Sequence, residues 1–139
     1  MNPVVHFEMP AKDKKRVSEF YTNVFGWNMQ QTGPEMGNYV VAHTTETDEN
    51  NMVKNPGVIN GGFYDYKDEE GFKSPSIVIA VDDLKASITA VKKAGGQVVG
   101  LQMEIPGIGS FISIKDTEGN RVGILQPAPM MPDLHMQKK

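Results

Sequence analysis

The segment VVHFEMPAKDKKRVSEFYTNVFGW, residues 4–27, holds the pattern on which the fold prediction rests. Its first part reads as an extended strand. A helix follows, because apolar side chains recur at the spacing of one helical face: Val17, Phe20, Tyr21 and Val24. Gly26 then ends the helix, as glycine in a left-handed conformation commonly does. The segment therefore predicts a strand followed by a helix.

A second segment, SIVIAVDDLKASITAVKKAGGQVV at 76–99, repeats this order. An offset of 70 residues (96 − 26) places Gly96 on Gly26 and aligns the two strands. Each helix precedes three extended runs: 27–32, 38–44 and 58–64, then 97–102, 110–115 and 121–126. The sequence thus predicts an α+β fold of two tandem βαβββ modules in one domain, 1–139. Their bounds are about 3–64 and 75–128, with a linker at 65–74 and a tail at 129–139.

Composition excludes several classes of function. The chain has 139 residues and a net charge of −3, so no basic patch is available for nucleic acid. It has no apolar run of 18 residues and no secretory leader, so we expect no membrane partner and a cytoplasmic location. There is no cysteine and there are three histidines, at 6, 43 and 135, which excludes thiolate and multi-histidine metal sites.

The first strand carries the main candidates for catalysis. His6 and Glu8 are two residues apart, so both side chains point to one face of the strand and can present an acid and a base to one pocket. Arg121 lies two residues before Gly123, so the two positions share one face of the strand. On that face Arg121 can pair with Glu8 or with an anionic ligand. In the alternative, Arg121 lies in the exposed EGNR turn and contacts only water.

Taken together, these motifs resemble the vicinal oxygen chelate superfamily, which holds glyoxalase I, extradiol dioxygenases and bleomycin-resistance proteins. The resemblance rests on the tandem module order, on FY…VFGW, and on a D-x-x-GN turn before a strand that ends in Gln126; it spans about residues 3–128. It implies eight strands in an incompletely closed barrel, or cup, whose concave face holds the ligand. In enzymatic members it also implies a divalent metal, with one ligand from the first and last strand of each module.

Few of those metal ligands carry over to this chain. His6 falls on the first-strand position, but its counterpart is Ser76, whose neutral hydroxyl is a poor ligand. The last-strand positions fall on Gly123 and within Asn60–Gly62. His6 is therefore only a remnant ligand, so we expect no cofactor; a divalent ion held by His6 and Glu8 is the alternative.

Further residues are predicted to bind a ligand: Trp27, Phe63, Ser76, Phe111, Arg121 and Gly123. Trp27 either stacks on the ligand or covers the edge of the core. Tyr39, Phe63 and Phe111 each face either the cup or the helix layer, which periodicity does not decide. Gly123 either kinks the sheet or leaves room for a ligand to approach the backbone.

Three classes of function follow. The preferred one is a glyoxalase/bleomycin-resistance-like protein that binds a small molecule in the cup without metal chemistry. The second is a lyase, isomerase or dioxygenase, metal-dependent or using His6 and Glu8, so whether the chain is an enzyme stays open. The third is a non-catalytic interaction module with a Met-rich tail. An open barrel edge also predicts a homodimer.

Overall fold

The computed structural model describes residues 1–50, 52–69 and 72–129, and the tail from residue 130 onward lies outside them. The first module consists of β1 (Val4–Ala11), α1 (Lys14–Phe25), β2 (Asn28–Gln31), the 3-10 helix η1 (Pro34–Met36), β3 (Val40–His43) and β4 (Asn60–Asp65). The second consists of β5 (Ser76–Ala80), α2 (Leu84–Lys93), β6 (Gln97–Ile105), β7 (Gly109–Lys115) and β8 (Arg121–Pro127). Within those residues, no helix is long and apolar enough to cross a membrane.

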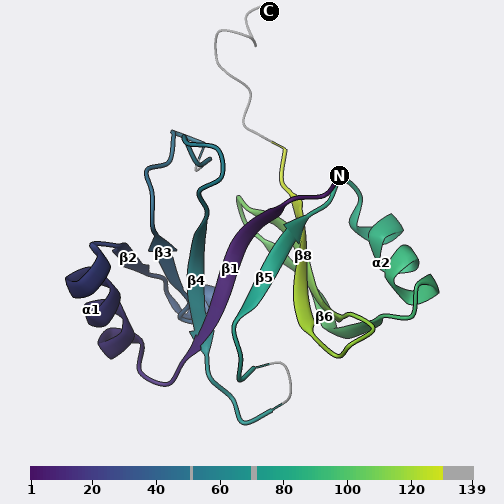
Figure 1. Cartoon of the computed structure of the whole chain (residues 1–139), viewed down its shortest axis with the longest axis horizontal. Coiled ribbons are helices and arrows are strands. Elements are labelled where there is room, and N and C mark those ends of the chain that lie inside the picture. Colours follow the sequence, from purple (N-terminus) through teal and green to yellow (C-terminus); the bar gives the residue numbers. More distant parts are fainter. Residues whose placement is uncertain (51, 70–71, 130–139) are drawn as a thin grey trace, which may run out of the picture.

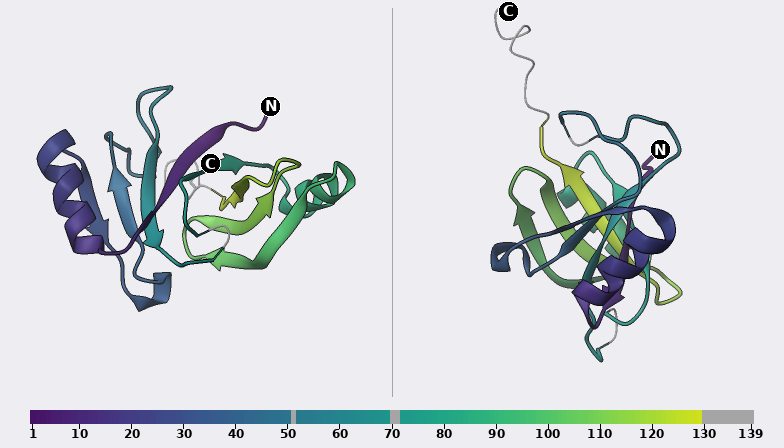
Figure 2. Two further views of the ribbon diagram at one scale, coloured as in Figure 1. Left: turned by 60° about the horizontal axis from the view of Figure 1, so that its bottom comes forward. Right: turned by 90° about the vertical axis from the view of Figure 1, so that its left-hand side faces the viewer.

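All strands belong to one sheet of eight strands in the order β2-β3-β4-β1-β5-β8-β7-β6 (Figure 1). The two modules meet edge to edge, because β1 pairs with β5 in antiparallel fashion. Within the described residues the outer strands β2 and β6 do not pair, so the sheet stays open. The two helices lie on the outer sides of the curved sheet (Figure 2). The predicted α+β fold with an incompletely closed barrel is confirmed.

The register between β1 and β5 explains the internal repeat. Phe7 lies opposite Ile77, and the two numbers differ by the same 70 residues (77 − 7). An axis of approximate two-fold symmetry therefore passes through this pair. Side chains alternate along β1, so His6 and Glu8 point to the concave face and Phe7 points to the helix-bearing face.

The core lies on the helix-bearing face, in one cluster per module. Around α1, the buried residues are Ala11, Val40, Ala42 and Phe63. Around α2, they are Val81, Leu84, Ile112, Ile114 and Ile124. Burying a side chain the size of Phe63 or Leu84 contributes about 1.5–3 kcal/mol. Each module thus packs its own helix on its own half of the sheet.

Local hydrogen bonds set where the helices begin and end. Asp13 and Asp83 cap α1 and α2 through their side-chain oxygens, and Gly26 ends α1 with φ 73°. The Gln126 side-chain oxygen accepts from the Leu84 backbone N–H at 2.9 Å. The glutamine at the end of the last strand therefore has a structural role, since it fastens β8 to the start of α2.

Candidate functional site

A polar row crosses the centre of the concave face, where the two modules meet. The register places Glu8 of β1 opposite Ser76 of β5. The Arg121 Nη1 donates to the Ser76 Oγ at 2.8 Å, and Arg121 Nη2 lies 3.8 Å from Glu8 Oε1. The side chains of Arg121 and Glu8 are only 10% and 12% exposed. Of the arrangements that the sequence left open, the structure shows Arg121 in an ion pair with Glu8, and not exposed to water in the turn.

Tyr39, in the turn before β3, joins the two residues of the first strand. Its hydroxyl is 3.0 Å from His6 Nε2 and also hydrogen-bonds the Glu8 carboxylate. A hydroxyl has one proton and an ionised carboxylate can only accept. Tyr39 therefore donates to Glu8, and the Nε2–H tautomer of His6 donates to the Tyr39 oxygen.

Burial determines the charge state of this cluster. It lowers the pKa of His6 from 6.5 to about 4, so the imidazole is neutral at pH 7. Burial raises the pKa of Glu8, although the Arg121 charge and the Tyr39 hydrogen bond act in the opposite direction. Burial and the Glu8 charge raise the pKa of Tyr39. The cup thus holds a neutral imidazole, one carboxylate with a raised pKa and one guanidinium.

The carboxylate and the guanidinium both keep unused hydrogen-bonding capacity. Among the described residues, Glu8 Oε1 and Arg121 Nε are buried without a hydrogen-bond partner. The guanidinium carbon of Arg121 lies 5.1 Å from the Tyr64 ring centre and 5.4 Å from that of Phe72. Aromatic faces attract such a cation but do not replace hydrogen bonds to its N–H groups.

Aromatic rings cover a glycine at matching positions of the two modules. A Cβ at Gly62 would collide with Tyr39, and a Cβ at Gly123 would lie 2.6 Å from Phe111 Cε2. Gly62 pairs with Val41, two residues after Tyr39, and Gly123 pairs with Ser113, two residues after Phe111. Both modules therefore fill the space of a last-strand side chain with a ring.

These rings decide whether the metal implied by the superfamily fits. A ligating side chain at Gly123 would need the space that Phe111 occupies, and His6 Nε2 is already engaged by Tyr39. Within the described part of the chain, no three His, Cys, Asp or Glu side chains come together as a metal site. The residues present do not fit a divalent ion, which normally takes three or more protein ligands.

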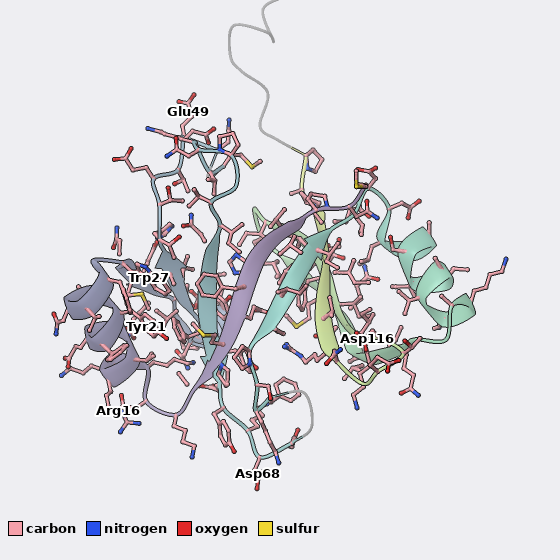
Figure 3. The ribbon with its side chains drawn as sticks, in the orientation of Figure 1. Arg16, Tyr21, Trp27, Glu49, Asp68 and Asp116 are labelled. Atoms are coloured by element: carbon pink, nitrogen blue, oxygen red, sulfur yellow. The ribbon has the colours of Figure 1, made fainter. Side chains whose placement is uncertain are left out.

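Two predicted ligand-binding residues lie on the other face of the sheet. Trp27 stacks on Tyr21 with ring centres 4.5 Å apart, between α1 and the strands (Figure 3). Phe63 is 1% exposed in the core beneath α1. Ser76, Phe111, Arg121 and Gly123 instead share the concave face with His6 and Glu8. The cup therefore contains the second-module candidates and excludes Trp27 and Phe63.

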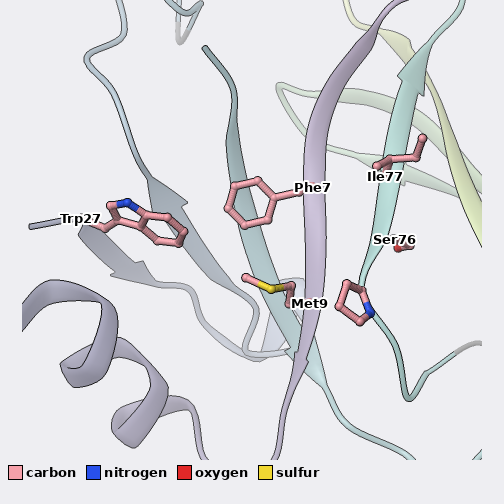
Figure 4. A pocket seen from close by; sticks show the side chains of 6 residues that line it. Phe7, Met9, Trp27, Ser76 and Ile77 are labelled. Carbon is pink, nitrogen blue, oxygen red and sulfur yellow. The ribbon is translucent and has the colours of Figure 1, made fainter. Parts of the chain in front are cut away.

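A hollow of about 380 Å³ lies on the helix-bearing face and shares only Ser76 with the polar row (Figure 4). Its lining is Phe7, Met9, Trp27, Pro75, Ser76 and Ile77. Almost all of these side chains are apolar, so the hollow has few groups that orient a ligand. We therefore place the candidate site at the polar cluster on the concave face.

Tyr39, Tyr64 and Phe72 also shape the cup. The sequence singled out only Tyr39, as a ring that faces either the cup or the helix layer. The runs GNYVV and GSFIS align Tyr39 with Phe111 at an offset of 72 (111 − 39), which marks the two rings as equivalents. Nothing in the sequence indicates that Tyr64 and Phe72 approach Arg121, because that contact depends on the path of the chain between the two modules.

Comparisons with known proteins agree with this architecture. Residues 4–45 match the family described as bleomycin resistance protein-like N-terminal. A glyoxylase-like domain-containing protein of Didymella fabae is 37% identical over 119 residues, 81% of this chain and 84% of that protein. A probable lactoylglutathione lyase of Vibrio cholerae is 28% identical over 88% of this chain and 89% of its own length.

Solved structures share the fold at low identity. A Streptomyces coelicolor methylmalonyl-CoA epimerase variant in complex with 2-nitronate-propionyl-CoA has a TM-score of 0.66 and 14% identity, covering 96% of this chain and 99% of the other. A Vibrio splendidus glyoxalase/bleomycin resistance protein/dioxygenase superfamily member has a TM-score of 0.59 and 11% identity, covering 92% of this chain and 100% of the other. The Didymella relative, together with the matched family description, shows that the chain belongs to the glyoxalase/bleomycin resistance/dioxygenase superfamily, whose fold the solved structures share.

Proposed function

We propose that the chain binds a small molecule on its concave face and that the Glu8–Arg121 pair orients it without a metal ion. One observation carries the proposal: a carboxylate and a guanidinium are buried side by side, and Glu8 Oε1 and Arg121 Nε lack a hydrogen-bond partner in the described residues. Buried polar groups without hydrogen-bond partners cost stability, and a ligand that supplies those hydrogen bonds removes the cost. Such groups are therefore candidates for a binding site.

Proteins of this fold include ones that bind small molecules. A structural neighbour, methylmalonyl-CoA epimerase, has been solved in complex with methylmalonyl-CoA. At 14% identity that likeness extends to the fold alone and not to the ligand. The polar cluster here draws on β1 and β5 and on the start of β8, so it forms only when the two modules come together.

Native mass spectrometry of the purified full chain tests the proposal. We expect one saturable small-molecule species per chain in the wild type and its loss in Arg121→Gln. Arg16→Gln is the matched control, because Arg16 lies on the outer side of α1, away from the cup (Figure 3). Circular dichroism checks that both variants fold. A wild type that carries no saturable species, or a control that loses it equally, would contradict the proposal.

Metal content provides an independent test of the site. After incubation with Mn, Fe, Ni or Zn and exhaustive dialysis, we expect less than a stoichiometric amount of metal on the wild type. One equivalent of metal retained by the wild type and lost in His6→Ala would show that His6 ligates a divalent ion. That result would favour the alternative of a metal-dependent enzyme.

A second candidate function is metal-free acid–base catalysis with Glu8 as the base. Its support is the raised pKa of Glu8, which moves a carboxylate toward the range where it accepts protons efficiently at neutral pH. Turnover of S-lactoylglutathione and of methylmalonyl-CoA, compounds named for the relatives, can be assayed with metal chelated. Activity that is lost in Glu8→Gln would favour this candidate over pure binding.

The homodimer expected from the sequence stays a prediction. Three side chains of α1 that carry large apolar surface are more than half exposed: Phe20, Val24 and Phe25. Exposed apolar surface of this kind often marks a protein contact. Sedimentation velocity should show a dimer for the wild type and a shift toward the monomer for Phe25→Glu; an unchanged wild-type monomer at all concentrations would remove the prediction.

A further inference from the structure

Glu8 and Arg121 lie close together without a direct hydrogen bond between them. Arg121 Nη2 and Glu8 Oε1 are 3.8 Å apart, and this distance exceeds the length of a direct charge-assisted hydrogen bond, about 2.7–2.9 Å. The usual two-pronged pairing does not form, because Arg121 Nη1 is turned to the Ser76 Oγ at 2.8 Å. A ligand beside the pair can therefore accept from the guanidinium with one atom and donate to the carboxylate with another.

Two further hydrogen-bonding positions point to the same kind of group. Glu8 Oε1 remains a free acceptor and Arg121 Nε–H a free donor in the part of the chain that the structure describes. Tyr39 and Ser76 hold the rest of the cluster in place through bonds to Glu8 and to Arg121. The pair therefore offers one donor and one acceptor side by side to a ligand.

We infer that the Glu8–Arg121 pair recognises a neutral group that both donates and accepts, such as a primary carboxamide, carried on an aromatic or other apolar body. The inference rests on the proposed function, since it names the ligand class of the same cup. The carbonyl oxygen accepts from Arg121 and the amide N–H donates to Glu8. No covalent step is involved.

Charge disfavours the two nearest analogues. A carboxylate of the same shape places a negative charge against Glu8, and an amidinium places a positive charge against Arg121. Each ion meets one like and one opposite charge, so the attraction and the repulsion largely offset one another. The ion still loses its hydration on entering a partly buried site, whereas a neutral group loses less, so the pair favours a neutral group.

The surroundings suit an apolar body. Phe111, over Gly123, and Val78 lie on the concave face beside the pair. The ring of Phe72 lies against the guanidinium with its centre 5.4 Å from the central carbon. A ligand ring that displaces Phe72 keeps the same stacking contact with Arg121, so entry exchanges one aromatic contact for another.

Three probes of one planar shape test the inference on the full chain: benzamide, benzoate and benzamidinium. Binding is followed by NMR through the Arg121 Nε–H resonance of ¹⁵N-labelled protein. We expect benzamide to bind the wild type most tightly, by about tenfold or more over either ion, since each ion loses more hydration on entering the site. In Glu8→Gln, benzoate should gain about tenfold relative to benzamide.

Glu104→Gln is the matched control, because it removes the same charge from an exposed position and should leave the ranking unchanged. The wild-type ranking stands even if Glu8→Gln fails to fold. Equal affinity for the three probes, a preference for an ion, or no binding of any probe to the wild type would each overturn the inference. In those cases a saturable species in native mass spectrometry would still support ligand binding by the cup.

Discussion

Lowering the pH should destabilise the chain through His6, and the size of the effect follows from its burial. The pKa of His6 is about 4 in the folded protein, against 6.5 for an unperturbed histidine. The difference is about 2.5 pKa units, and at about 1.4 kcal/mol per unit it amounts to about 3 kcal/mol. The unfolded chain takes up the proton first, so the free energy of unfolding falls as the pH drops from about 6.5 to about 4.

Urea denaturation of the wild type and His6→Gln at a series of pH values between 4 and 8 isolates this effect. Glutamine keeps an N–H that can donate to Tyr39 but does not titrate. The raised pKa of Glu8 acts in the opposite sense, because the folded state holds that proton more tightly, but this contribution is present in both proteins and cancels in their difference. The wild type should lose about 3 kcal/mol relative to the variant.

The baseline comes from pH 8, where the histidine is neutral in both states and the difference reports only the replacement of the imidazole by an amide beside Tyr39. Parallel stability curves for the two proteins between pH 6.5 and 4 would refute the reasoning. So would an NMR titration that places the pKa of His6 near its ordinary value.

Three smaller predictions concern single contacts. Gly123→Ala should cost about 1–3 kcal/mol of unfolding free energy by overpacking and lose most of that cost in a Phe111→Ala background, as a double-mutant cycle in urea would show; additive costs would contradict the ring-over-glycine contact. Tyr39→Phe should cost about 1–3 kcal/mol and raise the pKa of Glu8 further, because a hydrogen bond that lowers it is lost; a carboxylate NMR titration with no change would count against that bond. Asp83→Ala should cost about 1 kcal/mol by removing the cap of α2, and an unchanged thermal melt would rule that out.

Local patterns in the sequence determined the fold and which residues of the site can share a face. Strand and helix periodicities, read with the 70-residue offset (77 − 7), predicted two βαβββ modules, and the structure places Phe7 opposite Ile77 at that offset. The pairing of Glu8 with Arg121 was one of the arrangements left open by the sequence, because alternation along a strand fixes which residues share a face but not which of them meet. These are properties of neighbouring residues, which a single sequence records.

Tertiary structure alone decided which face each strand turns toward the helices and what fills the cup. A strand with apolar residues on both faces can turn either one to the core, so Phe63 lies beneath α1 and Phe111 lies in the cup although both are phenylalanines in strands. The ring of Tyr39 over Gly62, and the approach of Phe72 to Arg121, join segments far apart in the chain. Such contacts depend on the docking of the two modules, and periodicity within one strand contains no information about them.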